Sequence, residues 1–301
     1  MSISHAINAA QSGLKVSGLR ADIVATNVAN ASTPGYVRRS VLLGETLVGG
    51  RTSGVTATGV TRSADAALTA ERRTLSSDVA QASLMSSTWQ VLSSRLGDDA
   101  EGTGLFSKFS KFEAALSASV TSPESGTQLA ALLDSANAVV TELNSLSKLV
   151  SQQRSEADRE IADGVKVVNK ALKQIEELNG LLVGVDGSTS QAAALMDERQ
   201  RTLDTIAEYL PIEVVPREGG AIDIITVEGV YLVAGKAKQL EFSPANSFGA
   251  DMTLDNGALS GLTIDGQNLT PGASSYAAVS SGMFGALFTL RDTDLPAFGA
   301  Q

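Results

Sequence analysis

The residue types that most often carry out catalysis are scarce in this sequence. It has no Cys and a single His, His5, near the start of the chain. The lack of Cys excludes disulfides, thiol nucleophiles and Cys-based metal sites. A His-dependent triad or a multi-His metal centre would have to be built around the N-terminus, where a rigid site is hard to hold.

Acidic side chains offer the remaining route to catalysis. Asp197, Glu198 and Asp204 could form the acid cluster of a hydrolase. Asp197 and Arg201, however, are four residues apart on a helical pattern, where an ordinary surface ion pair explains them. The Gly-rich segment 97–104 lacks the Lys of a phosphate loop and carries acids that would repel phosphate. We therefore expect no enzyme, no cofactor and no metal site.

Composition and charge limit the classes of partner that this chain is expected to bind. The 301 residues favour two or more domains, and 43% apolar with 19% charged residues favours a folded chain. The net charge is −10, yet residues 1–62 carry a surplus of +4 and the remainder −14. The cations in residues 1–62 are scattered and lack a platform of aromatic residues, so we expect no nucleic acid partner. No window is apolar enough to span a bilayer and no cleavable leader is visible, so we also expect no membrane partner.

A long amphipathic helix is expected at the start of the chain. Apolar and small residues alternate spacings of four and three over about four heptads, the pattern of helices that pack on helices. We call six of them the N-terminal stripe: Ile3, Ile7, Ala10, Leu14, Val24 and Val28. Val16, Leu19 and Ile23 lie off this stripe, so the helix has apolar surface on a second side. We expect the N-terminal stripe to pack against other subunits.

A turn motif ends this helix. Pro34 cannot continue a helix and Gly35 permits a positive φ, so residues 33–36 are expected to form a tight turn. Asparagine side chains can hydrogen-bond the free backbone groups at the helix end. The residues expected to set the direction in which the chain leaves the helix are Asn27, Asn30, Thr33, Pro34, Gly35 and Tyr36.

Further helices are expected after two β-like stretches at 37–43 and 54–60. A second helix should run from about 65 to 96, and a stripe of Phe106, Phe109, Phe112 and Leu116 on a short helix is expected to pack in a core. Ser122 and Pro123 are typical of a helix start. The apolar pattern that follows would span roughly 80–90 Å if unbroken. A polar segment, 151–160, interrupts it with a slip in phase.

The remaining pattern completes the expected architecture. A helix at 191–210 precedes a Gly-, Val- and Ile-rich segment with short strands such as 222–227, 230–233 and 252–254, and 281–291 is helical again. We predict a mainly α protein with an elongated, coiled-coil-like helical bundle, an N-terminal axial helix and a small β-rich domain. The expected divisions are 1–62, 63–210, 211–280 and 281–301.

Taken together, these motifs resemble those of a known family. A heptad helix ending in Asn-x-x-Asn-x-x-Thr-Pro-Gly-Tyr is similar to the start of the flagellar rod, hook and hook-associated proteins. Residues 59–65, the long helix, residues 195–203 and residues 285–292 are similar to the first of the hook-associated families, at the hook–filament junction. The resemblance extends over essentially the whole chain.

The resemblance implies a structural, non-enzymatic protein outside the cell, in the bacterial flagellum. It implies export through the flagellar type III route without a cleaved signal peptide. The implied partners are further copies in a ring, the hook protein and the second hook–filament junction protein. We expect the family's C-terminal helix, and with it the usual site for an export chaperone, to lie outside these 301 residues. The segment 281–301 would then begin the returning helix.

Two alternatives stay open at this stage. The chain could be another axial rod or hook protein, because the N-terminal motif is shared among them. It could also be a peripheral membrane-binding protein that uses its basic N-terminal helix. Sedimentation with vesicles that requires residues 1–30 would favour the membrane.

Overall fold

The computed structural model describes residues 3–48, 51–98, 102–245, 248–249, 251–273 and 275–300. Contacts group the chain into two compact units. Unit 1 holds Met1–Ser76 and Val167–Gln239, and unit 2 holds Ser77–Lys166 and Leu240–Gln301. Helices α2 (Ala66–Leu96) and α4 (Gly126–Val183) contribute residues to both.

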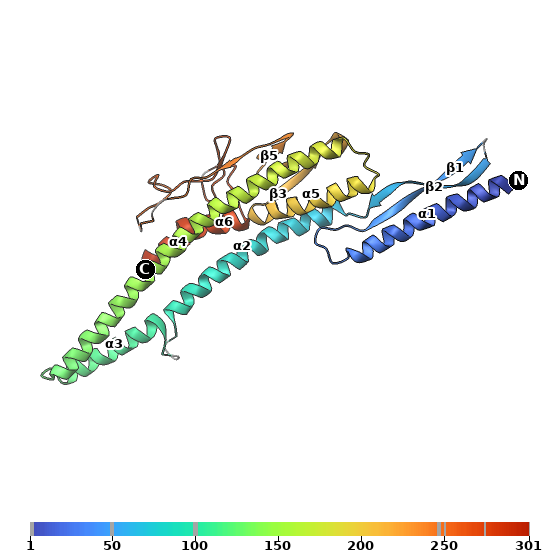
Figure 1. The fold of residues 1–301 in the computed structure, drawn as a ribbon. Coiled ribbons are helices and arrows are strands. Elements are labelled where there is room, and N and C mark those ends of the chain that lie inside the picture. Colours follow the sequence, from blue (N-terminus) through green and yellow to red (C-terminus); the bar gives the residue numbers. More distant parts are fainter. Residues whose placement is uncertain are drawn as a thin grey trace. The chain divides into compact units, whose positions relative to one another are not determined.

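Unit 1 begins with a helix that lies along a β-hairpin. Helix α1 spans Ile3–Ala29, and strands β1 (Arg39–Val48) and β2 (Arg51–Arg62) pair antiparallel beside it (Figure 1). The off-stripe residues Val16 and Ile23 are the buried side chains of α1. Both strands are longer than the β-like stretches expected from the sequence. The second apolar side of the helix is thus covered by the chain itself.

Gly54 permits a close approach between this hairpin and α1. Its φ is +142°, and a Cβ there would lie 2.3 Å from the Oγ of Ser12. The N–H of Val55 donates to the same Oγ at 3.2 Å. A side chain at position 54 would therefore push the strand away from the helix.

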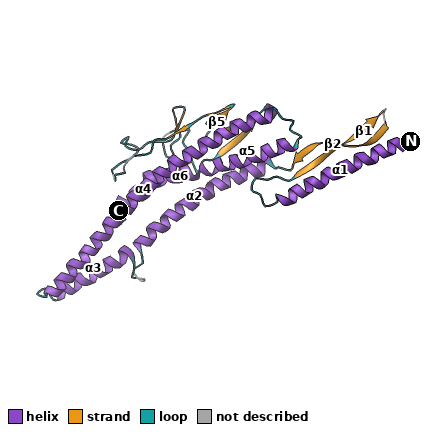
Figure 2. Cartoon of the chain, viewed as in Figure 1, coloured by secondary structure: helices purple, strands orange, loops and turns teal. Residues whose placement is uncertain are grey.

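The rest of unit 1 packs helices on a four-stranded antiparallel sheet. The helices are the parts of α2 and α4 in this unit and α5 (Ser190–Tyr209). The sheet has the order β3-β4-β5-β6, with bounds Ile212–Pro216, Ile222–Thr226, Tyr231–Ala234 and Lys236–Ala237, and a 3₁₀ turn, Glu218–Gly220, joins the first two. Figure 2 shows these strands apart from the β1–β2 hairpin. Asn179 links α4 to the sheet, since its Nδ2 donates to the carbonyl of Ile222 at 2.8 Å.

Unit 2 is built on the remaining parts of α2 and α4, with α3 (Gly104–Thr121). Three two-residue strands follow, at Leu240–Glu241, Thr263–Ile264 and Gln267–Asn268 (β7 to β9). The chain then turns helical in α6 (Gly282–Thr289), a π-helical turn (Leu290–Asp294) and α7 (Leu295–Ala300). A core cluster joins α2 and α4 to this segment, through Leu92, Val150, Leu290 and Leu295.

The polar segment 151–160 lies inside helix α4, and the expected slip in the phase of the apolar pattern stays a prediction. Helix α4 runs unbroken for 58 residues, about 87 Å at 1.5 Å per residue. Two charged residues of this segment, Arg154 and Asp158, are buried, and so is Arg291. Arg291 Nη1 lies 2.6 Å from Asp158 Oδ1, and Arg154 Nε donates to the carbonyl of Arg291 at 2.9 Å. Arg154 and Asp158 thus bind the C-terminal helical segment to α4 through Arg291.

Three other local expectations were wrong. Ser122 follows the end of α3 instead of starting a helix, and α4 begins at Gly126, after a turn in which the N–H of Ser125 donates to the carbonyl of Ser122. Residues 252–254 form no strand. Phe106 and Phe109 are exposed, because within this chain no described element covers their face of α3.

The fold class is confirmed as mainly α with small β elements. The division into 1–62, 63–210, 211–280 and 281–301 stays a prediction.

Candidate functional site

The N-terminal stripe is exposed along the whole of α1. Ile3 is 80% exposed, Leu14 76% and Val28 72%, and the other three members are exposed as well. An ordinary core helix would bury such a face. The expected role of the N-terminal stripe in subunit packing stays a prediction, and its exposure leaves it available for such a role.

Asn27 organises the end of α1. Its Nδ2 donates to the carbonyl of Arg39 at 2.8 Å, and its Oδ1 accepts from the N–H of Arg39 at 2.9 Å and from the hydroxyl of Tyr36 at 2.8 Å. Asn30 Nδ2 donates to the carbonyl of Thr26 at 3.0 Å. The side chain of Asn27 thus pairs with the first residue of β1 much as a neighbouring strand would.

The tight turn expected at residues 33–36 is present. The N–H of Tyr36 donates to the carbonyl of Thr33 at 3.1 Å, and Gly35, after Pro34, has a φ of +74°. A Cβ on Gly35 would lie 2.3 Å from Cγ of Arg201 on α5. The structure therefore brings the turn residues together and seats their turn against α5.

Asp197 on α5 is the main charged link to the hairpin. Its side chain is 3% exposed; Arg39 Nη2 donates to its Oδ2 at 2.7 Å, and Arg62 Nε donates to its Oδ1 at 2.9 Å. The expected surface pair between Asp197 and Arg201 was wrong. Arg39 begins β1 and Arg62 ends β2, and the two are paired across the strands, so one carboxylate holds both strands at the open end of the hairpin.

A second carboxylate links α5 to α2. Asp204 Oδ1 accepts from Arg73 Nε at 3.1 Å, and its Oδ2 lies 2.6 Å from Arg72 Nη2. Gln200 accepts from Arg73 Nη2 at 2.9 Å. Burial lowers the pKa of Arg73, against the attraction of Asp204, and the like charge of Arg72 lowers it further.

Arg199 on α5 is held by neutral groups. Its Nη1 donates to Asn179 Oδ1 at 3.0 Å and to the carbonyl of Gly220 at 2.7 Å. Burial, and then the like charge of Arg62, lower the pKa of Arg199 to about 10. Sequence patterns identify neither Arg199 nor the two arginines that pair with Asp197, because their partners lie far away along the chain.

The acids considered for catalysis have structural partners. Asp197 and Asp204 pair with arginines, and Glu198 Oε1 accepts from Gln174 Nε2 at 3.0 Å. Within the described residues no cluster of three metal-ligating side chains is found. No helix of the described part of the chain is long and apolar enough to cross a bilayer.

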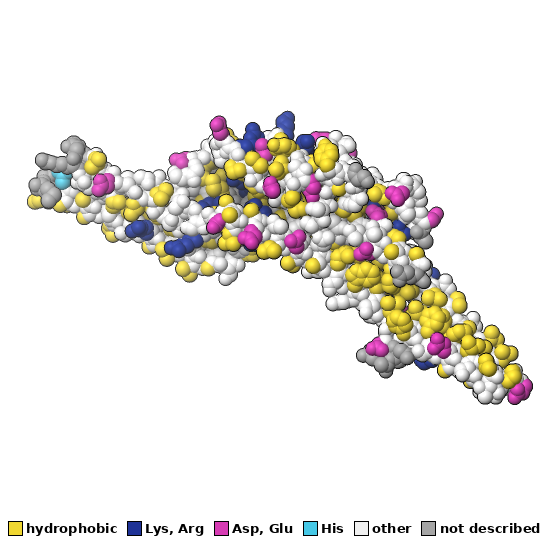
Figure 3. Space-filling view, turned by 180° about the vertical axis from the view of Figure 1, so that it is seen from behind, with side chains coloured by type: hydrophobic (Ala, Val, Ile, Leu, Met, Phe, Trp, Pro, Cys, Tyr) yellow, Lys and Arg dark blue, Asp and Glu magenta, His cyan; other side chains and the backbone are white. Residues whose placement is uncertain are grey.

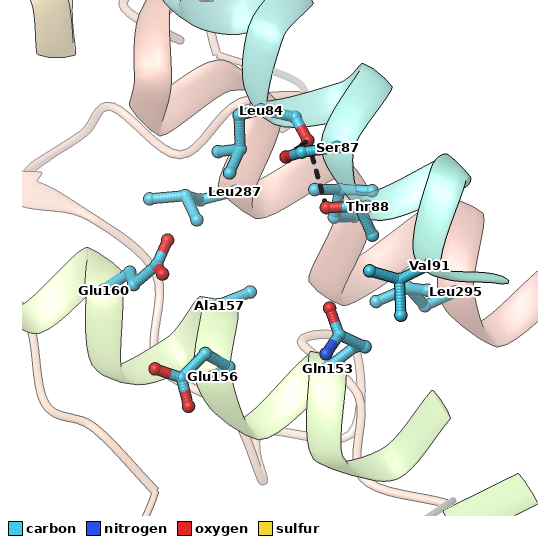
Figure 4. A pocket seen from close by; sticks show the side chains of 11 residues that line it. Leu84, Ser87, Thr88, Val91, Gln153, Glu156, Ala157, Glu160, Leu287 and Leu295 are labelled. Carbon is cyan, nitrogen blue, oxygen red and sulfur yellow. Dashed lines mark hydrogen bonds between the residues drawn. The ribbon is translucent and has the colours of Figure 1, made fainter. Parts of the chain in front are cut away.

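Unit 2 has a small cavity of about 170 Å³ between α2, α4 and the C-terminal helical segment. Figure 4 shows Glu156 and Glu160 from α4 and Thr88 from α2 among its lining side chains. Burial raises the pKa of Glu160, and the like charge of Glu156 raises it further. Thr88 donates to the carbonyl of Leu84 at 3.0 Å. Two acids, one of them paired with Arg159, do not by themselves assemble a catalytic site.

Unit 2 also exposes apolar side chains around α3 and the start of α4. Figure 3 shows apolar side chains gathered over this end of the two helices. The exposed apolar residues of these two helices include Phe106, Val120, Leu129 and Leu133. This surface and the N-terminal stripe each hold several exposed apolar residues on one element or two adjoining ones, the kind of surface that often contacts another molecule.

Two family models match the chain. Residues 90–301 match the model described as the helical domain of flagellar hook-associated protein FlgK, which is more than half of the chain. Residues 7–36, which include most of α1 and the turn, match the model of the flagella basal body rod protein.

Curated relatives are similar over most of the chain. Flagellar hook-associated protein 1 of Salmonella typhimurium is 25% identical over 253 residues, covering 81% of this chain and 45% of the relative. The protein of the same description from Escherichia coli is 24% identical over 304 residues, covering 97% of this chain and 53% of the relative. The chain thus spans about half the length of the curated relatives it matches.

A solved structure shares the fold. The flagellar hook junction protein FlgK from Burkholderia pseudomallei superposes with a TM-score of 0.57 at 17% identity, covering 76% of this chain and 39% of that protein. At this identity the likeness concerns the fold alone.

Proposed function

The chain belongs to the family of flagellar hook-associated proteins, and from this premise we propose that it is a structural component of the bacterial flagellum, an adaptor at the junction of hook and filament. The matched relatives carry the name hook-associated protein 1. The observation that carries the mechanism is the N-terminal stripe, which is exposed on α1 while the opposite side of the helix is buried by the hairpin.

The N-terminal stripe would act by burial against neighbouring helices. Full burial of an aliphatic side chain contributes about 1.5–3 kcal/mol, and Ile3, Ile7, Leu14, Val24 and Val28 are all large and exposed. In the chain by itself, the buried side chains of α1 are those of Val16 and Ile23. Neighbours that cover the N-terminal stripe would therefore stabilise α1 as they bind, which couples the ordering of the terminus to assembly.

The pairing of Asp197 with Arg39 and Arg62 would give this assembly a defined geometry. The hairpin packs along α1, and Asp197 fixes both strands, at the open end of the hairpin, to α5. The turn at Thr33–Tyr36 is seated on the same helix through Gly35 and Arg201. Force applied to α1 would thus pass into the rest of unit 1 through paired, largely buried groups.

The partners and location follow from the same proposal. The chain would contact further copies of itself in a ring, the hook protein and the second hook–filament junction protein. It would lie outside the cell, after export without a cleaved signal peptide. The family is structural, and we propose that this chain catalyses no reaction.

A second candidate is an axial role in another part of the rod or hook. The match of residues 7–36 to the basal body rod model favours it. This segment is the part that axial proteins share, whereas the match of residues 90–301 is to the hook-associated helical domain. The position in the flagellum separates the two candidates, because a rod protein would be found below the hook.

The substitution Leu14→Asp in the full gene tests the packing role. Because Leu14 is 76% exposed, the purified variant should keep the wild-type circular dichroism and thermal midpoint. Incorporation into flagella, measured by immunoblot of purified hook–filament preparations, should be lost. The control Lys15→Asp changes the charge by more at the adjacent exposed position, off the N-terminal stripe, and should incorporate. Normal incorporation of Leu14→Asp would overturn the proposal.

A further inference from the structure

Unit 1 contains a cavity of about 550 Å³ between α2, α5 and the first strands of the β3–β6 sheet. Its volume is within the usual range of about 300–1,000 Å³ for ligand sites. The apolar part of its wall includes Met196, Leu203 and Ile212, and the charged part includes Arg62, Arg73 and Arg199. The cavity therefore combines an apolar surface with three guanidinium groups.

The charges near this cavity do not balance. Asp197 forms ion pairs with both Arg62 and Arg39, and Asp204 forms ion pairs with both Arg73 and Arg72. Two carboxylates thus face four guanidinium groups. Arg199 is a fifth, and in the described part of the chain its hydrogen bonds go to the amide of Asn179 and the carbonyl of Gly220.

Two more carboxylates line the cavity, at Glu71 and Glu213. Both are exposed, whereas Arg73 is buried and the Arg62 side chain is 14% exposed. The solvated acids therefore lie at the rim and the desolvated charge is positive. Even with both rim acids counted, the set of five arginines and four acids keeps a surplus of one positive charge.

Arg62 has hydrogen-bonding capacity to spare. Its Nη2 is buried and lies 2.7 Å from Asp197 Oδ1, yet it makes no hydrogen bond of acceptable geometry in the described structure. A buried donor whose geometry does not allow a hydrogen bond is unfavourable, so a further acceptor at this nitrogen would be stabilising. Burial and the charge of Arg62 lower the pKa of Arg199. An anion bound nearby would offset both effects, which also favours an anionic ligand here.

We propose that this cavity binds the carboxylate side chain of a protein partner, presented on a segment whose flanking residues are apolar. The guanidinium groups of Arg199 and Arg62 would receive the carboxylate, in charge-assisted hydrogen bonds. Met196, Leu203 and Ile212 would contact the flanking side chains. A surplus of one charge suits a monovalent carboxylate better than a dianionic phosphate. The inference does not depend on the proposed function.

The test compares two blocked peptides, acetyl-Leu-Glu-Leu-amide and acetyl-Leu-Gln-Leu-amide, titrated into the ¹⁵N-labelled 301-residue chain. The Glu peptide should bind about tenfold more tightly, the effect of one charge-assisted hydrogen bond. Its amide shift changes should be confined to the cavity wall, including Gln200 and Leu203. Equal binding of the two peptides, no binding, or inorganic phosphate shifting the same amides more strongly would each overturn the proposal.

Variants separate a binding role of Arg199 from a structural one. Arg199→Gln can still donate to Asn179 and Gly220 but removes the charge, so the preference for the Glu peptide should disappear. Arg199→Lys keeps the charge and should keep most of the preference. Arg159→Gln removes the same charge from an exposed position in unit 2 and should change nothing. Retained preference in Arg199→Gln would contradict the inference, as would equal loss in Arg199→Gln and Arg199→Lys.

Discussion

Asp197→Asn probes the link between the hairpin and α5. The substitution keeps the size of the side chain and removes its charge. It leaves Arg39 and Arg62 facing a neutral amide, although both are close to buried, at 11% and 14% exposed. The amide oxygen can accept from one of them, but the amide nitrogen cannot accept from the other.

The expected loss follows from these contacts. A hydrogen bond to a charged group contributes about 1.5–3 kcal/mol, and breaking a buried ion pair on one side costs about 3–5 kcal/mol. Because both arginines keep slight access to water, we expect the lower end, about 3 kcal/mol of unfolding free energy. By contrast, Asp163→Asn breaks an exposed pair with Lys166, for which roughly 0.5 kcal/mol or less is expected.

The assay should report on unit 1 alone. The single Trp, Trp89, lies in unit 2, so its fluorescence does not follow the hairpin. Amide hydrogen exchange of residues 39–48 and 51–62 does, and Asp197→Asn should lower their protection about 100-fold or more, the equivalent of roughly 3 kcal/mol. Urea unfolding followed by circular dichroism gives the global value. A loss no larger than that of Asp163→Asn would refute the assignment of Asp197 as a buried link.

Two further predictions concern single groups. Burial raises the pKa of Glu160 above its ordinary value of 4.5. The folded chain therefore binds the proton of this carboxyl more tightly than the unfolded chain does. The free energy of unfolding falls as the pH rises from 4.5 through the pKa of the folded state. Glu160→Gln should therefore raise the thermal midpoint near pH 7 and change it little near pH 4; an equal effect at both would contradict the burial argument. Gly54→Ala should destabilise the hairpin by about 1–3 kcal/mol, because its φ and the contact with Ser12 disfavour a side chain. The control Gly18→Ala, which meets open space on α1, should stabilise by up to about 1 kcal/mol, and hydrogen exchange of the hairpin measures both.

Periodicity and turn chemistry predicted the parts of the fold that depend on neighbouring residues. The 3–4 spacing located α1 and separated its exposed N-terminal stripe from the side that buries Val16 and Ile23. Pro34 and Gly35 located the turn, because their backbone preferences act locally. The helix of residues 191–210 was located to within one residue for the same reason.

Contacts between distant residues could not be predicted in this way. Asp197 has Arg201 one turn away, yet it pairs with Arg39 and Arg62, which are 158 and 135 residues distant in sequence. Only the fold makes these groups neighbours, and burial then makes the pairing worth more than a surface pair.

Buried polar groups were also not predicted from the sequence. Arg154 and Asp158 have the composition of a solvated face, and local spacing does not distinguish that from a buried network completed by Arg291. The Phe106 stripe gave the reverse error. Periodicity shows that a face is apolar, but it does not show whether the same chain or another molecule covers it.

The most direct test of the account asks whether Leu14 is covered in the flagellum. The sequence has no Cys, so Leu14→Cys in the full gene places one thiol on the N-terminal stripe. The account predicts rapid maleimide labelling of the purified chain and strong protection in intact flagella, while Lys166→Cys, at an exposed position of α4, shows the access of the reagent in each sample. Equal labelling rates of Leu14→Cys in the purified chain and in intact flagella would contradict it.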